Sequence, residues 1–168
     1  MTKEMDINAN LRTSFWFQFG ASMEMLENAI AMCPDKNWDT SSRIWYNVYH
    51  CLFWTNYYLS TKPDEFVPPS TFSFSEFDPS GKLPERTYSK DELITYLTHC
   101  KDKAHQLISL LTFEKLNERW INEYKDFSLL EILMYNMRHI QHHAAQLNLV
   151  LRQTIDDSPK WVGRVKSS

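Results

Sequence analysis

Residues 128–153 read SLLEILMYNMRHIQHHAAQLNLVLRQ, and this stretch decides the fold class. The Ser128-x-x-Glu131 pair at its start is typical of a capping box, in which the serine oxygen accepts an early backbone N–H and the glutamate reaches back to the cap. Apolar side chains then recur every three or four residues, the spacing of one buried helical stripe: Leu133, Met137, Ile140, Ala144, Leu147 and Leu151. The pattern predicts a long helix over residues 128–153.

A second helix with the same two signals precedes it, over about residues 89–111. Ser89-x-x-Glu92 predicts another capping box. The apolar stripe that follows again has intervals of three and four: Leu93, Leu97, Cys100, Ala104, Leu107, Ile108 and Leu111. This helix is expected only to pack against its neighbours.

The first third of the chain predicts two more helices. One covers about residues 7–32 and ends before Pro34, with one apolar side: Phe15, Phe19, Met23, Leu26 and Ile30. The other covers about residues 41–59, and Asp39, Thr40 or Ser41 can cap it. No strand-like alternation competes, so the sequence predicts an all-α four-helix bundle.

A long connection, residues 60–88, holds five of the seven prolines: Pro63, Pro68, Pro69, Pro79 and Pro84. A return along a helix of about 20 residues spans ~30 Å, and extended chain covers ~3.3 Å per residue. This crossover is therefore long enough for the helices at residues 41–59 and 89–111 to run parallel. Its phenylalanines indicate that it packs against the bundle: Phe66, Phe72, Phe74 and Phe77. After the last helix, residues 154–168 are expected to form a strap anchored by Trp161.

Composition limits the partners of the chain. Its 168 residues are 43% hydrophobic, which fits one folded domain over residues 1–168. The net charge of −3 argues against nucleic acid. Charges near the N-terminus do not fit a signal peptide, so we expect a cytoplasmic protein. Residues 44–61 lack Asp, Glu, Lys and Arg, but Asn47, His50 and Asn56 interrupt them, which favours a buried bundle helix over a membrane span.

The cysteines do not suggest a disulfide framework or a thiolate metal site. Cys33, Cys51 and Cys100 are odd in number, widely spaced and form no C-x-x-C pair. Reduced and buried thiols are the expectation.

The histidines carry the most informative chemistry. His139 and His143 are four residues apart, so they project about 40° from each other on one helix face and can share a metal ion. His50, in an aromatic stretch, is the candidate third ligand. His142 turns away from the apolar stripe and is assigned to the surface, and His99 and His105 are expected to face solvent. The alternative is that His50 is a core histidine with a polar partner and that the other two lie on a polar helix flank.

Two stretches, YHCLFWTNYYL at residues 49–59 and MRHIQHHAAQL at residues 137–147, resemble the DinB-like superfamily, as does the proline-rich crossover between them. The resemblance covers nearly the whole chain. It implies one DinB-like domain with up-down-down-up topology and a divalent metal held by three histidines, which correspond to His50, His139 and His143. Where the family motif often reads His-Arg-Gly-Gln, this chain has His143-Ala144-Ala145-Gln146. This departure removes an arginine that a substrate contact would use and leaves the three ligands untouched.

The resemblance, to a family related to bacillithiol transferases and mycothiol-dependent enzymes, also implies a function. A three-imidazole site lowers the pKa of bound water or thiol toward neutrality. The leading hypothesis is a metal-dependent transferase that joins a low-molecular-weight thiol to a small electrophile. Hydrolysis by metal-bound hydroxide is a related possibility. The alternative is a non-catalytic metal-binding, interaction or stress-response bundle. Zinc or nickel is the expected metal, Gln146 and Tyr46 are candidate supports of the site, catalytic residues are unassigned, and a homodimer is a family-level expectation.

Overall fold

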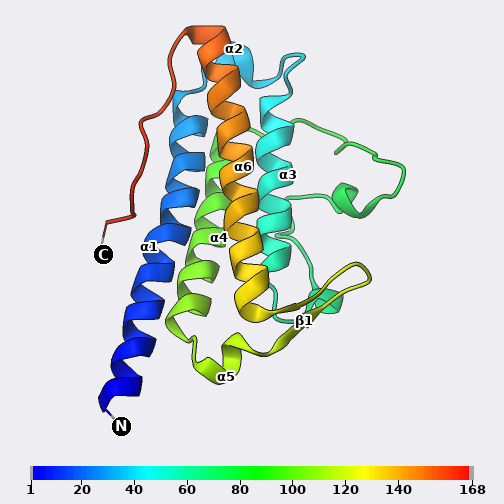
Figure 1. Cartoon of the computed structure of the whole chain (residues 1–168). Helices are drawn as coiled ribbons and strands as arrows, with labels where there is room; N and C mark the ends of the chain where they lie inside the picture. Colours follow the sequence, from blue (N-terminus) through cyan, green and yellow to red (C-terminus); the bar gives the residue numbers. More distant parts are fainter. Residues whose placement is uncertain (1, 167–168) are drawn as a thin grey trace.

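Four long helices form the body of the protein. The computed structural model describes residues 2–166, with side chains from residue 9 onward. The helices are α1 (Thr2–Met32), α3 (Ile44–Tyr58), α4 (Lys90–Ser109) and α6 (Leu129–Ile155). Helices α1 and α3 each pack against both α4 and α6, so they lie on a diagonal of the bundle. Figure 1 shows α1 and α6 running upward and α3 and α4 downward, which confirms the predicted all-α bundle with an up-down-down-up order.

Short elements fill the connections. Helix α2 (Asp35–Trp38) follows α1, the turns η1 (Pro63–Glu65) and η2 (Ser75–Phe77) lie in the crossover, and α5 (Phe113–Leu116) follows α4. Strands β1 (Arg119–Ile121) and β2 (Asp126–Ser128) pair as an antiparallel hairpin that leads into α6. The expectation of no strand was wrong here, because each strand has three residues, too few for a period-two pattern to show.

The helix starts agree with the predicted capping box in full at Ser89 and in its serine half at Ser128, and they differ from the predicted cap at α3. Ser89 and Glu92 form a full capping box, and the Ser128 side chain accepts from the Glu131 N–H. Helix α3, however, starts after Arg43 and has no side-chain cap. The prediction of an Asp39, Thr40 or Ser41 cap was wrong.

The reason is that Asp39 has other partners. Its carboxylate accepts hydrogen bonds from Trp45 Nε1 and Thr87 Oγ1, both at 2.8 Å. Asp39 therefore ties the start of α3 to the end of the crossover instead of capping the helix.

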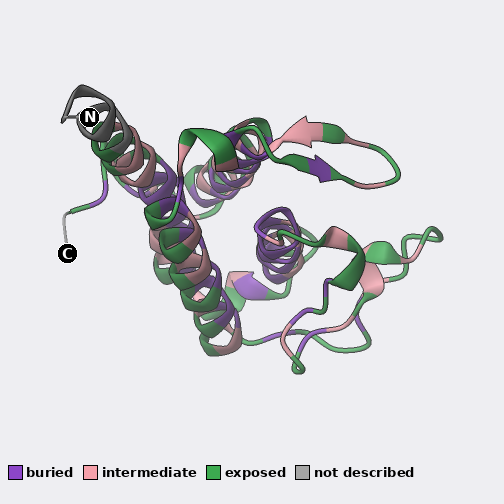
Figure 2. Cartoon of the chain, turned by 90° about the horizontal axis from the view of Figure 1, so that it is seen from below, coloured by how far each residue is buried: buried purple, intermediate pink, exposed green. Residues whose placement is uncertain are grey.

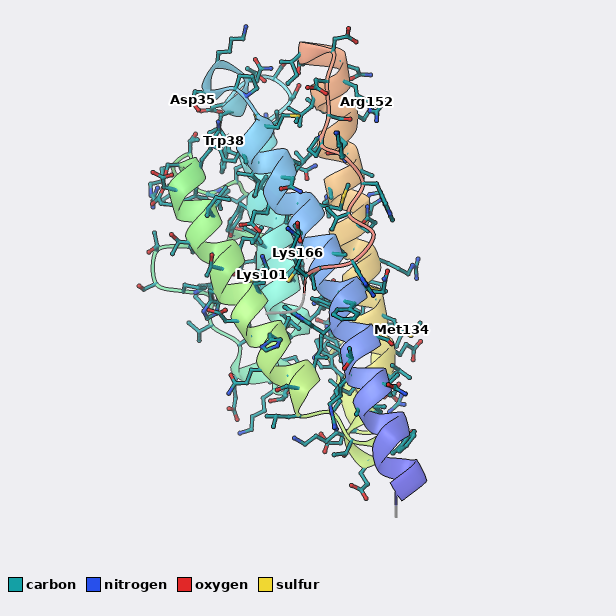
Figure 3. All side chains as sticks on the ribbon, turned by 90° about the vertical axis from the view of Figure 1, so that its left-hand side faces the viewer. Asp35, Trp38, Lys101, Met134, Arg152 and Lys166 are labelled. Carbon is teal, nitrogen blue, oxygen red and sulfur yellow. The ribbon has the colours of Figure 1, made fainter. Side chains whose placement is uncertain are left out.

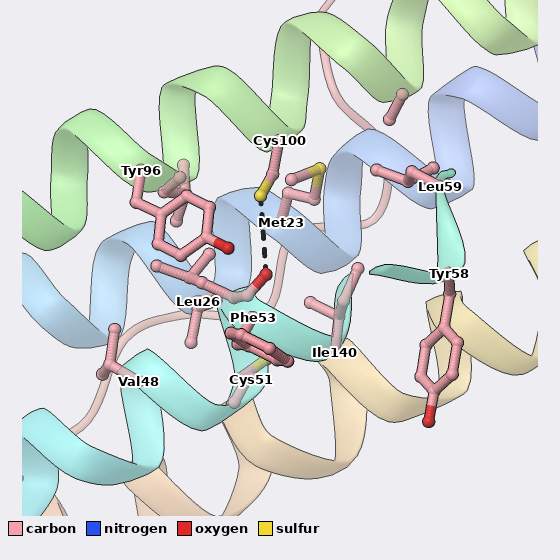
Figure 4. Packing of buried hydrophobic residues seen from close by; sticks show 14 of the residues in the cluster. Met23, Leu26, Val48, Cys51, Phe53, Tyr58, Leu59, Tyr96, Cys100 and Ile140 are labelled. Carbon is pink, nitrogen blue, oxygen red and sulfur yellow. Dashed lines mark hydrogen bonds between the residues drawn. The ribbon is translucent and has the colours of Figure 1, made fainter. Parts of the chain in front are cut away.

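The apolar stripes predicted for α1, α4 and α6 face one shared core. Buried residues lie toward the inside of the bundle in Figure 2 and exposed residues toward the outside. In the close view of Figure 4, Met23, Leu26, Cys100 and Ile140 meet from α1, α4 and α6, and the Cys100 thiol donates to the Leu52 carbonyl at 3.6 Å. All three cysteines are free and buried, as predicted, and burial raises the pKa of the Cys51 thiol to about 12.

Most residues of helix α3 are buried, and its buried amide Asn56 has hydrogen-bond partners inside the protein. Asn56 is buried, donates to the Tyr96 hydroxyl at 3.2 Å and accepts from Lys103 Nζ at 2.8 Å. Among the described helices, none is long and apolar enough to cross a membrane. This agrees with the interpretation of residues 44–61 as a bundle helix.

The crossover, residues 60–88, packs against α3 through aromatic side chains. Phe66 and Phe72 are buried, and the Phe77 ring lies edge-on to the Phe53 ring with centroids 5.0 Å apart. The Tyr49 hydroxyl donates to the Ser73 carbonyl at 2.8 Å, and the Ser73 N–H donates to the Tyr88 hydroxyl at 2.9 Å. The prediction that this loop packs down is confirmed for Phe66 and Phe72; Phe77 keeps its ring contact with Phe53 but is 41% exposed, and Phe74 is 49% exposed.

The C-terminal strap follows the outer side of α1, as Figures 1 and 3 show. Trp161, the predicted anchor, is 73% exposed, so that prediction was wrong. Val165 is the anchor instead: it is buried over Gly20, and its N–H donates to the Phe17 carbonyl at 3.1 Å. A β-carbon at position 20 would lie 2.7 Å from Val165 Cγ1, so only glycine leaves room for this contact. Residues 167–168 of the predicted strap lie outside the described residues.

Candidate metal centre

The fold brings together the three predicted histidines. His50 comes from α3, and His139 and His143 come from successive turns of α6, the helix that packs beside α3. One ligand atom from each lies within 4.8 Å of the other two. The ring centroids of His50 are 5.8 Å from His139 and 4.9 Å from His143. All three rings are half-buried, and small side-chain rotations bring such nitrogens onto one ion.

The hydrogen bonds leave one free nitrogen on each ring. His50 Nδ1 lies 2.6 Å from a Glu76 oxygen, and His143 Nδ1 lies 3.2 Å from Asn47 Oδ1. Because both partners accept, Nδ1 donates in each case, and Nε2 keeps its lone pair. His139 Nε2 is buried and has no hydrogen-bond partner among the described residues. A buried nitrogen without a partner is costly unless a ligand such as a metal ion satisfies it, so these residues fit a divalent metal.

Glu76 is the residue of the site that sequence reasoning missed. It lies in η2 of the crossover, its side chain is 5% exposed, and its Oε2 also accepts from Trp54 Nε1 at 2.8 Å. Burial opposes its ionisation, but the hydrogen bonds from His50 and Trp54 outweigh burial and hold its pKa below the ordinary value. A carboxylate in this position fixes the imidazole orientation and raises its basicity as a ligand. Its only sequence signal is that it is the acidic residue of the aromatic run FSFSEF at residues 72–77.

His143 is oriented in a similar way by amides. Asn47 Nδ2 donates to Gln146 Oε1 at 3.1 Å, which leaves Asn47 Oδ1 to accept from His143. Gln146, a predicted support, thus acts on the cluster through Asn47. The sequence signal for Asn47 is its position one turn before His50 on the same helix face.

The environment keeps the α6 histidines neutral. Burial lowers the pKa of His139 to about 3, and the charges that His143 and His50 would carry lower it as well. Burial likewise lowers the pKa of His143 to about 4, together with His50 and His142. Neutral imidazole is the form that binds metal.

The remaining candidates lie around the cluster or away from it. Tyr46, the other predicted support, has its ring centroid 6.3 Å from that of His50, and burial together with Glu76 raises the pKa of its hydroxyl. His142, His99 and His105 are exposed, as predicted.

Two cavities reach the histidines from the surface. One has a volume of about 460 Å³ and includes Tyr135, Arg138 and His139 in its wall. The other has a volume of about 540 Å³ and includes Arg43, Tyr46, His50 and His143. Among the described residues the group of metal-ligating side chains has three members, the number of protein ligands typical of catalytic rather than closed structural zinc sites.

The fold and the cluster together define a helical bundle with an accessible three-histidine centre. The DinB superfamily model matches residues 18–147, which include α3, the crossover and all three histidines, and the chain belongs to this superfamily. No curated protein and no solved structure shows a significant match to the chain.

Proposed function

We propose that this protein is a divalent-metal-dependent enzyme that transfers a low-molecular-weight thiol to a small electrophilic molecule. The observation that supports it most directly is the convergence of three imidazoles with free Nε2 atoms, one of them buried with no hydrogen-bond partner in the described part of the chain. The superfamily membership supports a metal-dependent enzyme of this kind.

The residues of the chain have separate parts in this proposal. His50, His139 and His143 hold the ion, which supplies Lewis acidity that lowers the pKa of a thiol toward neutrality. Glu76 and Asn47 fix the orientation of two of these rings through Nδ1. In the transfer the thiol sulfur forms a bond to the electrophilic carbon, the leaving group departs with the bonding electrons, and the thiol proton passes to solvent.

Metal analysis tests the site first. Tag-free protein, dialysed extensively, is expected to contain about one divalent ion per chain, and His50→Ala, His139→Ala and His143→Ala are each expected to lose it while retaining their helical circular dichroism. His142→Ala is the matched control, because His142 is exposed and adjacent to His143, and it is expected to keep the ion. Wild-type protein that takes up neither zinc nor nickel contradicts the proposal and favours a non-catalytic bundle.

Activity is the second test. The metal-loaded protein is expected to accelerate the reaction of cysteine with 1-chloro-2,4-dinitrobenzene, and the three alanine variants are expected to lose that acceleration. Metal binding without turnover across thiols and electrophiles leaves a metal-binding protein and removes the transferase. Zinc or nickel as the metal, homodimerisation and a cytoplasmic location stay predictions.

A further inference from the structure

The cavity beside His50 and His143 has an unusual balance of charge. Its wall contains hydroxyl, amide and ring groups, no acidic side chain, and one permanent charge, the guanidinium of Arg43. Its volume of about 540 Å³ is in the range of small-molecule sites and too small for a folded partner. The Glu76 carboxylate lies behind this wall, where it binds His50, so Arg43 is the charged side chain that the wall itself presents, and it suits an anionic small molecule.

Arg43 is available to such a molecule. Two other arginines bind carboxylates closely: Arg86 is 2.6 Å from Glu92, and Arg119 is 2.6 Å from Asp126. Within residues 9–166, by contrast, Arg43 takes part in no ion pair and donates no side-chain hydrogen bond to another residue. A guanidinium matches the geometry of carboxylate and phosphate oxygens, with which it forms paired hydrogen bonds.

The backbone holds Arg43 in place at some cost. Its φ of 45° and ψ of 51° lie in the left-handed region, where a β-carbon is unfavourable and glycine is the usual residue. The described chain has one other residue of this kind, Asp156, far from the histidines at the end of α6. Strained residues that carry a functional side chain are typical of ligand sites.

The distance from Arg43 to His50 limits the length of the ligand. Asn47 and His50 lie three residues apart on one face of α3, and Arg43, the residue that precedes the helix, lines the same cavity. Seven residues of helix correspond to a rise of about 10.5 Å between the α-carbons of Arg43 and His50. The Arg43 side chain itself covers part of that distance. A ligand that joins its guanidinium to the histidines is therefore only a few bonds long.

From these observations we infer that the substrate carries an anionic oxygen group, most simply a carboxylate, which Arg43 binds while the reacting end lies at the three histidines. This inference rests on the proposed function, because it names the class of substrate for the same site. It assigns Arg43 as a specificity-determining residue.

A pair of thiols that differ in one charge tests the inference. Protein loaded with Co²⁺ is titrated with 4-mercaptobutanoate and with 4-mercapto-1-butanol, and binding is followed by the sulfur-to-cobalt charge-transfer absorption. Wild-type protein is expected to bind the carboxylate at least ten-fold more tightly. Arg43→Gln and Arg43→Gly are expected to bring the ratio of the two dissociation constants close to one. Arg43→Gly relieves the strained backbone, so its unfolding midpoint is expected to be no lower than that of wild type.

Arg138→Gln is the matched control, because Arg138 lines the cavity on the other side of the cluster and also has no carboxylate partner among the side chains that the structure describes. This variant is expected to keep the wild-type ratio. Equal affinities for the two thiols in wild type overturn the inference and leave the proposed function standing. A preference that survives in Arg43→Gln reflects chelation of the metal, and an equal loss in Arg138→Gln reflects overall charge; either result overturns the assignment to Arg43. Failure to bind Co²⁺ overturns the proposed function and the inference together.

Discussion

The crossover and the C-terminal strap are both irregular segments that lie on the outside of helices, yet they are held in different ways. The crossover buries large rings, Phe66 and Phe72, accepts a hydrogen bond from Tyr49 of α3 and has an internal one between Ser73 and Tyr88. The strap buries two smaller side chains, Pro159 and the Val165 that lies over Gly20, and leaves its tryptophan exposed. Because neither segment belongs to a long helix, we expect each to be held mainly by the apolar surface it buries, which is larger for the crossover.

The two segments also differ in their relation to the histidines. The crossover places Glu76 against His50, whereas the strap lies along α1 and contributes no residue to the cavities beside the cluster. Anchoring of the crossover should therefore affect metal binding, and anchoring of the strap should not. The predictions below test that contrast.

The largest effect is expected from Phe72→Ala. The Phe72 ring stacks on Tyr96 with centroids 4.3 Å apart and meets Tyr88 at 4.9 Å. Removal of this buried ring is expected to lower the free energy of unfolding by about 3–5 kcal/mol, measured by urea denaturation. The control is Phe74→Ala in the same segment, which is 49% exposed and should cost less than about 0.5 kcal/mol. Equal losses in the two variants would show that burial does not anchor the crossover.

Glu76→Gln is expected to weaken metal binding by about 10- to 100-fold, because the amide accepts a weaker hydrogen bond from His50 Nδ1 and no longer increases its basicity. Competition with a chromophoric chelator measures the affinity for Zn²⁺. Glu65→Gln is the matched control: it makes the same change in the same crossover, where the side chain is 69% exposed and pairs with Lys62. An unchanged affinity in Glu76→Gln would mean that the crossover does not support the centre.

Gly20→Ala is expected to release the strap with little change in global stability. The new β-carbon displaces Val165, while alanine gains about 0.8–1.0 kcal/mol of helix propensity. Hydrogen exchange of the Val165 N–H, which is bonded to the Phe17 carbonyl, should accelerate at least ten-fold, and metal affinity should stay as in wild type. If the metal affinity falls instead, the strap is coupled to the centre and the contrast between the two segments is wrong.

The smallest effect is expected from Trp161→Ala. A side chain that is 73% exposed contributes little burial, so the change in unfolding free energy should stay within about 0.5 kcal/mol. Urea denaturation beside wild type is the measurement. A loss above 1.5 kcal/mol would restore Trp161 as the anchor of the strap.

The helices and the histidine cluster were predictable because both depend on periodicity. A stripe such as Leu93, Leu97 and Cys100 defines the buried face of α4, and the interval from His139 to His143 places two imidazoles on one face whatever the rest of the chain does. His50 was predicted as the third ligand from its aromatic surroundings and from the superfamily resemblance. All of these signals lie within short stretches of sequence, which is why they can be recognised without a structure.

The side chains that orient the histidines are placed by contacts between distant segments. Such contacts produce no periodic pattern in the sequence. Glu76 binds His50, which lies 26 positions earlier in the sequence. Asp39 accepts hydrogen bonds from Trp45 and Thr87 instead of capping α3. Trp161 was a wrong anchor because size alone does not decide burial. The groove on α1 exists where Gly20 lacks a β-carbon, and it fits the smaller Val165.

The separation of the histidines along the chain has a consequence for biosynthesis. His50 belongs to the first third of the protein, whereas His139 and His143 lie on its last helix. During synthesis a ribosome adds about 5–20 residues per second, and helices α1, α3 and α4 emerge before α6. The three-histidine cluster therefore cannot form on a nascent chain that ends before residue 143, so the ion of the proposed centre would find its full set of ligands only after α6 has been synthesised.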